Sequence, residues 1–162
     1  MTPRRSSATS TKPGARRSGD EDGRVEVSAG GVVVHGTDVI VIVPARRDAR
    51  GNRVLALPKG HPDGTETLEA AAAREVAEET GVTAELIGPL GEVRYTYERR
   101  GRRIAKMVAF YLFEYRSGDL EDHDEEIVEA RWMALEKAAR ALTYEGERGM
   151  VARALSRSSS DR

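Results

Sequence analysis

Two runs of β-branched residues open the regular hydrophobic pattern of the chain. Residues 25–34 (VEVSAGGVVV) and 39–43 (VIVIV) flank a Gly-Thr-Asp sequence at 36–38. Apolar runs joined by such a turn are typical of a β-hairpin. Gly30 and Gly31 interrupt the first run, and glycine inside a strand indicates a bulge or the close approach of another backbone or a ligand.

Later apolar segments predict further strands and helices. Residues 84–98 and 104–115 alternate apolar and polar positions on either side of an arginine-rich hairpin tip, which is the pattern of half-buried strands. The other expected elements are, in chain order, a loop at 46–52, a strand at 53–57, an acidic loop at 118–126, a strand at 128–133, and helices at 135–142 and 145–155. Helices beside a mixed sheet predict a layered α/β domain.

The segment 60–82, GHPDGTETLEAAAAREVAEETGV, is expected to form a helix in its second half. Its alanines are strong helix formers, and Thr65 or Thr67 can cap its start. Gly81 suits the position just past its end.

Three glutamates of this helix, Glu75, Glu78 and Glu79, follow an i, i+3, i+4 spacing, so their carboxylates share one side. Like charges at this spacing cost about 0.2–0.5 kcal/mol, and acids near a helix C-terminus oppose the helix dipole. Mg²⁺ prefers carboxylate oxygens and would turn the repulsion into ligation. The alternative is a solvated acidic face on a surface helix.

The complete spacing of the segment resembles the signature of the Nudix hydrolases. The matching positions are Gly60, Glu66, Arg74-Glu75-Val76, Glu78-Glu79 and Gly81-Val82. The resemblance implies an α/β/α sandwich with a mixed sheet and a Mg²⁺- or Mn²⁺-dependent hydrolase of phosphoanhydride bonds. The sequence LPKGH at 57–61 is similar to the same region of dinucleoside polyphosphate hydrolases and of some nucleotide-sanitising relatives.

Metal ligands are implied by the same resemblance. The side chains of Glu75, Glu78 and Glu79 are the expected carboxylate ligands, and a backbone carbonyl at Lys59 or Gly60 is a further expected oxygen. Nudix enzymes use such a set to hold one to three divalent ions, so we predict the metal site here.

The remaining catalytic roles fall on residues around this set. Arg74 is expected to orient the carboxylates and, with Glu75, to belong to the catalytic group; the alternative is a surface ion pair worth ~0–1 kcal/mol. Glu66 is expected either to join the ligands or to hydrogen-bond the loop. The acidic loop should supply a metal ligand or general base, for which we select Glu126, with Glu125 in reserve. A merely solvated loop is the alternative.

Substrate phosphates require cations, and a purine can stack on an aromatic ring. The expected substrate-binding residues are Lys106, Lys59, Arg46 and Tyr95, with Arg47, Tyr97 and Tyr144 as further candidates. Lys106 lies where the tetraphosphate-cleaving relatives place a lysine. The alternatives are a solvent-facing lysine and core tyrosines. The three histidines, His35, His61 and His123, are scattered and are expected to be surface or structural residues.

Composition limits the class of protein. With 162 residues the chain suits one domain, and its 39% hydrophobic and 33% charged residues indicate a soluble globular protein. No apolar run approaches the ~18 residues of a membrane span. The absence of cysteine excludes disulfides and thiolate chemistry and fits a cytoplasmic location. Whether the protein is a monomer or a homodimer is left open.

Residues 1–24 differ from the expected domain, 25–155, and residues 156–162 are expected to fray. The first segment is rich in Ser, Thr, Pro, Gly and Arg and carries six basic and three acidic residues, so we expect a disordered tail with a net charge of +3. It could contact nucleic acid electrostatically or act as a transit peptide, but a solubilising or dispensable tail is the favoured interpretation. It has no apolar core of a secretory signal.

The favoured function is therefore metal-dependent hydrolysis of a dinucleoside polyphosphate by activated water. Within the same family, the alternatives are a nucleoside triphosphate sanitising pyrophosphatase, an RNA 5′-pyrophosphohydrolase and a diphosphoinositol polyphosphate hydrolase. A nucleotide-binding regulatory Nudix domain is the non-enzymatic alternative. Such domains commonly lose signature carboxylates, and this segment has lost none.

Deletion of residues 1–20 should leave the hydrolysis of small nucleotides unchanged, because the composition of this segment provides neither core nor site residues. Steady-state kinetics of the full and shortened chains with Mg²⁺ would test this. A large loss of activity in the shortened chain would contradict the prediction.

Overall fold

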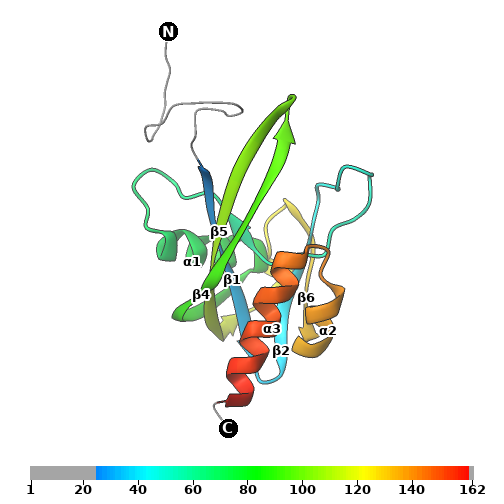
Figure 1. The fold of residues 1–162 in the computed structure, drawn as a ribbon. Helices are drawn as coiled ribbons and strands as arrows, with labels where there is room; N and C mark the ends of the chain where they lie inside the picture. Colours follow the sequence, from blue (N-terminus) through cyan, green and yellow to red (C-terminus); the bar gives the residue numbers. More distant parts are fainter. Residues whose placement is uncertain (1–24, 161–162) are drawn as a thin grey trace. The chain divides into compact units, whose positions relative to one another are not determined.

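The computed structural model describes residues 25–160 (Figure 1), so the predicted tail at 1–24 lies outside the described residues. The described part divides into two compact units. The small unit consists of residues 25–27 and 94–107, and the large unit of residues 28–93 and 108–160. Each unit is described by itself below.

The strands form a six-stranded mixed sheet in the order β4-β5-β1-β2-β6, with β3 paired to β1. The elements are β1 (Val25–His35), β2 (Asp38–Pro44), β3 (Lys59–Gly60), α1 (Leu68–Thr80), β4 (Val82–Arg99), β5 (Arg102–Gly118), a short 3-10 helix (Leu120–Asp122), β6 (Ile127–Ala134), α2 (Leu135–Ala141) and α3 (Glu145–Ser160). Residues 25–160 contain no helix that is both long and apolar enough to cross a membrane.

Helices cover both faces of the sheet in the large unit (Figure 1). On one face, Val32 and Phe110 belong to an apolar cluster with Leu135 of α2 and Val151 of α3. On the other face, α1 buries Val76 at 1% exposure against the sheet. Because side chains alternate along a strand, a strand that lies between two layers of helices needs apolar residues on both of its faces. The predicted α/β/α sandwich is confirmed.

The glycine pair of β1 marks a close approach made by the chain itself. A Cβ on Gly31 would lie 2.7 Å from Val76 Cγ2 and 2.8 Å from the Phe113 ring, so α1 packs directly onto the backbone here. A Cβ on Gly30 would overlap the Pro58 carbonyl, which accepts a hydrogen bond from the Gly31 N–H at 3.1 Å. Glycine is therefore required at both positions of β1, because a side chain on either residue would clash with packed neighbours.

The predicted strand at 53–57 is wrong. Only isolated bridges, such as Ile42 with Ala56, form there, and the two-residue β3 follows instead. The backbone of Leu55 exchanges hydrogen bonds with Thr143, through its N–H to Oγ1 at 2.8 Å and through its carbonyl from the Thr143 N–H at 2.9 Å. These partners come from the connection between α2 and α3, so the segment cannot complete a ladder with a strand.

The helix α3 continues to Ser160, five residues beyond the helix end expected at residue 155. Arginine side chains anchor the helix along this length. Arg153 donates to the Leu90 carbonyl at 2.9 Å, and Arg157 donates to the Pro89 carbonyl at 3.1 Å. These contacts with β4 extend the helix beyond its last apolar residues.

Gly31→Ala should destabilise the protein by about 1–3 kcal/mol, because the added methyl group must displace Val76 or Phe113 in a packed layer. Denaturant unfolding would measure the change. Gly88→Ala is the matched control, since a Cβ there meets nothing within 4 Å. Equal stability of the two variants would contradict this account of the β1 glycines.

Candidate functional site

Local sequence signals place the ends of α1 where they were predicted. Thr67 caps the start by accepting the Ala70 N–H at 3.1 Å, and Gly81 ends the helix in the left-handed region at φ 79°. A Cβ on Gly81 would also lie 2.6 Å from the Asp119 carbonyl. The residue is therefore glycine both for its backbone angle and for the loop that packs on it.

Arg74 is the centre of a hydrogen-bond network that joins the loop before α1 to the helix. Its guanidinium makes two bonds to the carboxylate of Glu66, at 2.9 and 3.0 Å, and one to the His61 carbonyl at 2.9 Å. The same group reaches Glu75 at 3.1 Å and Glu78 at 3.3 Å. Hydrogen bonding from Arg74 lowers the pKa of Glu66, and the bond to Glu66 raises the pKa of Arg74. Glu66 therefore accepts hydrogen bonds from Arg74 and from the Asp63 N–H of the loop before α1.

Two carboxyl groups of α1 are costly to ionise. Burial raises the pKa of Glu75, against the opposing effect of Arg74, and the neighbouring Glu78 and Glu126 raise it further. Burial also raises the pKa of Glu79 to about 8, although its Oε1 accepts the Lys59 N–H at 3.0 Å. These carboxyl groups therefore lie in surroundings that favour a cation.

The donor chemistry of the site fits a divalent cation. Carboxylate oxygens are the ligands that Mg²⁺ prefers, and Gly60 brings backbone against them, because a Cβ there would overlap the Glu75 carboxylate. Among the residues that the structure describes, no three carboxylate or imidazole side chains already form a closed ligand set. Glu75 and Glu78 are turned toward Arg74 instead.

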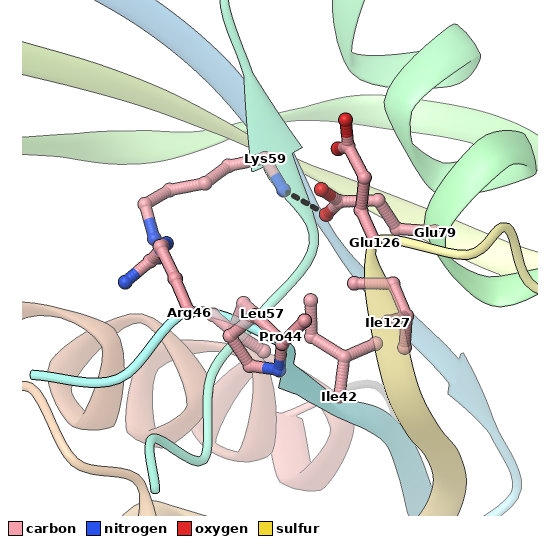
Figure 2. A pocket seen from close by; sticks show the side chains of 9 residues that line it. Ile42, Pro44, Arg46, Leu57, Lys59, Glu79, Glu126 and Ile127 are labelled. Atoms are coloured by element: carbon pink, nitrogen blue, oxygen red, sulfur yellow. Dashed lines mark hydrogen bonds between the residues drawn. The ribbon is translucent and has the colours of Figure 1, made fainter. Parts of the chain in front are cut away.

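The acidic loop packs against the end of α1. The Asp124 N–H donates to the Glu78 carbonyl at 2.9 Å, and the Glu126 carbonyl accepts the Ala45 N–H at 2.8 Å. Glu126 itself is exposed and lies immediately before β6. Figure 2 shows its carboxylate beside that of Glu79. The loop therefore brings a fourth predicted carboxylate to the helix.

A pocket of about 290 Å³ adjoins these carboxylates (Figure 2). Four predicted site residues line it, namely Arg46, Lys59, Glu79 and Glu126. Its other walls are largely apolar and come from Ile42, Pro44, Ala45, Leu57 and Ile127. The pocket thus combines acidic side chains, basic side chains and an apolar floor.

Lys59, predicted to bind substrate, has its ammonium group paired with an acid of α3. Its Nζ lies 2.9 Å from Glu147 Oε2 in α3 and 5.6 Å from the centre of the Tyr144 ring. Sequence reasoning missed Glu147, because a single glutamate in the first turn of a helix carries no distinguishing signal. Only its burial, at 3% exposure, marks it as unusual.

Lys106 and Tyr95 belong to the small unit. There Lys106 Nζ lies 3.8 Å from Glu26 Oε1, and Tyr97 donates to the same carboxylate at 2.6 Å. Burial, followed by this hydrogen bond, raises the pKa of Tyr97 to about 12. Tyr95 is exposed, with its ring 6.3 Å from that of Tyr97. The substrate roles of Lys106 and Tyr95 stay predictions.

The other candidates lie on the surface of the large unit. Arg47 donates to the Gly51 carbonyl at 3.0 Å, and Glu125 is exposed. His35 lies 3.4 Å from Glu114 and packs on Trp132, and His123 lies beside the Asp124 carbonyl. None of the three histidines lines the pocket beside the carboxylates.

Comparison with known proteins gives consistent matches. The model of the NUDIX domain matches residues 25–154. MutT4 of Mycobacterium tuberculosis (strain CDC 1551 / Oshkosh) is 38% identical over 131 residues, covering 78% of this chain and 53% of MutT4. The 8-oxo-(d)GTP phosphatase of Mycolicibacterium smegmatis is 35% identical over 102 residues, covering 63% of this chain and 30% of that protein. The chain thus spans about half, or less, of the length of these curated relatives.

The fold is shared with solved structures. A C. elegans Ap4A hydrolase in a binary complex superposes with a TM-score of 0.65, covering 84% of this chain and 99% of that one. The two sequences are 21% identical, so the likeness concerns the fold.

Glu79→Gln should remove a pH dependence from the stability of the metal-free protein. The folded protein holds a proton on Glu79 up to a pKa of about 8, whereas the unfolded chain releases it near the ordinary value of 4.5. The free energy of unfolding of the wild type should therefore fall as the pH rises through this window, by at most about 1.4 kcal/mol per pH unit.

Urea unfolding with a chelator between pH 5 and 9 would measure this slope in both proteins. The Gln variant should lose this contribution, gain stability relative to the wild type near pH 8, and lose metal-dependent hydrolysis. Parallel stability curves for the two proteins would contradict the assigned pKa of Glu79.

Proposed function

The chain belongs to the Nudix family, and we propose that it hydrolyses a phosphoanhydride bond in a nucleoside diphosphate derivative with the help of Mg²⁺ or Mn²⁺. The observation that carries this proposal is the set of glutamates on α1, held by Arg74 beside the glycine-containing strand β3. A carboxylate cluster that costs free energy without a cation supports a metal-dependent reaction.

Different residues would have different roles in such a reaction. Glu75, Glu78 and Glu79 would hold the cation, with a carbonyl of Lys59 or Gly60 as a further oxygen, and Arg74 would keep the carboxylates oriented. A bound divalent cation neutralises phosphate charge and lowers the pKa of a water molecule. Glu126, exposed at the rim of the pocket, would accept the proton of the attacking water, a contribution of typically ~10²–10⁴-fold.

Arg46 is the pocket cation that we assign to the substrate phosphates. The pocket is lined by two basic side chains, and the ammonium group of Lys59 is already paired with Glu147. Arg46 is exposed and lines the same pocket as Glu79 and Glu126; in Figure 2 its guanidinium lies across from the two carboxylates, beside the end of the Lys59 side chain. Its five N–H groups can bind phosphate oxygens in pairs.

Within this reaction class we propose a dinucleoside polyphosphate as substrate. The LPKGH sequence supports it, as does Lys106 at the position where tetraphosphate-cleaving relatives place a lysine, and a solved Ap4A hydrolase has the same fold. A nucleoside triphosphate is the second candidate, because a relative that is 35% identical is an 8-oxo-(d)GTP phosphatase.

A substrate panel with Mg²⁺ or Mn²⁺ would test the proposal. It should contain dinucleoside polyphosphates, nucleoside triphosphates, nucleotide sugars and diphosphoinositol phosphates, with products identified. We expect the highest kcat/KM for a dinucleoside polyphosphate. A preference for nucleoside triphosphates would establish the second candidate instead, and no turnover of any compound would overturn the enzymatic assignment.

Arg46→Ala should raise KM by about tenfold or more for the preferred substrate, since a charge-assisted bond contributes ~1.5–3 kcal/mol. Arg50→Ala is the matched control, because Arg50 is exposed in the same loop and does not line the pocket. Equal KM values for both variants would contradict the role of Arg46.

A further inference from the structure

Glu147 is a buried acid whose two oxygens are both used by one short segment. It lies in the first turn of α3 and is 3% exposed. Its Oε1 accepts the backbone N–H of Leu57 at 2.9 Å, and its Oε2 lies 2.9 Å from the Nζ of Lys59. A side chain of α3 therefore holds the chain immediately before and within β3.

The other side of this segment meets the carboxylates of α1. The backbone N–H of Lys59 donates to Glu79 Oε1 at 3.0 Å, as Figure 2 shows, and Gly60 lies against Glu75. Residues 57–60 thus connect Glu147 of α3 with Glu79 of α1 through three hydrogen bonds.

Contacts with β1 also hold the segment, because Lys59 and Gly60 pair with Gly30 and Ala29 and the Pro58 carbonyl accepts the Gly31 N–H at 3.1 Å. The strand β3 contains two residues, and Pro58 has no N–H with which to join a ladder. Leu57 is fully buried, so its N–H cannot turn to water when Glu147 is withdrawn, and an unpaired buried N–H costs about 1–3 kcal/mol. A backbone shift that relieves this cost would move the Lys59 N–H away from Glu79.

We propose that Glu147 is a positioning residue for the metal-binding carboxylates, acting through the Leu57 N–H and the backbone of Lys59. It touches neither substrate nor metal, and its importance for catalysis rests on the proposed function. This role depends on a side-chain oxygen that reaches the Leu57 N–H. The charge of Glu147 keeps the buried carboxylate paired with Lys59.

A simple buried ion pair between Glu147 and Lys59 makes the opposite prediction for two conservative variants. Glu147→Gln keeps an oxygen at the same reach for the Leu57 N–H and loses the charge; its NH₂ group then faces the Lys59 ammonium, whose long side chain must turn away. Glu147→Asp keeps the charge but withdraws the carboxylate by about 1.5 Å, one C–C bond. The long side chain of Lys59 can follow it by rotating about its own bonds, whereas the Leu57 N–H can follow only if the backbone of residues 57–59 shifts.

The experiment compares Mn²⁺ affinity by calorimetry and exchange of the Leu57 and Lys59 amide protons by NMR in the two full-length variants. We expect Glu147→Asp to weaken Mn²⁺ binding by ~10–100-fold and to speed exchange of both amides, and Glu147→Gln to stay within ~3-fold of the wild type. An equal or larger effect of Glu147→Gln would overturn the proposal and leave an ordinary ion pair.

Glu145→Gln and Glu145→Asp are the matched controls, because Glu145 is exposed in the same helical turn, and both should behave as the wild type. Near-UV circular dichroism establishes that each variant is folded. Neither main readout needs turnover. A wild type that hydrolyses nothing in the substrate panel would therefore defeat the proposed function, while the order of the two Glu147 variants would still decide this inference.

Discussion

The site depends on the hydrogen bonds from the guanidinium of Arg74 to three carboxylates. One planar group, with five fixed N–H donors, binds Glu66 in the loop and both Glu75 and Glu78 in the helix. Without it, acids crowded at the end of α1 would repel one another and oppose the helix dipole. Through the His61 carbonyl, Arg74 also holds the loop that follows β3. The strand β3 itself lies beside the carboxylates of Glu75 and Glu79.

A second set of contacts comes from the opposite face of the sheet. The helix α1 supplies the carboxylates, whereas α3, which packs on the other side, supplies Glu147 beneath the segment that joins them. The segment beside the carboxylates of α1 is thus held by hydrogen bonds from the other layer. The third contribution, the acidic loop with Glu126, depends on the end of α1 through the bond from Asp124 to Glu78.

Features with local causes were predictable from the sequence. The Thr67 cap and the Gly81 end follow from signals within one helix, and the structure has them where they were expected. Features that depend on distant partners were not. The Lys59–Glu147 pair spans 88 residues, and the expected strand at 53–57 fails because Thr143 and Glu147 take its backbone groups. Nothing in the local pattern signals such partners.

The two glycines of β1 limit how such a site can change. Because Gly30 and Gly31 have packed neighbours at the positions of their missing side chains, the layers around the carboxylates leave no room for growth from the sheet. Arg46, by contrast, stands in an exposed loop whose neighbours at Arg47 and Arg50 are also exposed. On the proposed role of Arg46, substitution in this loop would alter substrate preference, while the interior that holds the carboxylates stays the same.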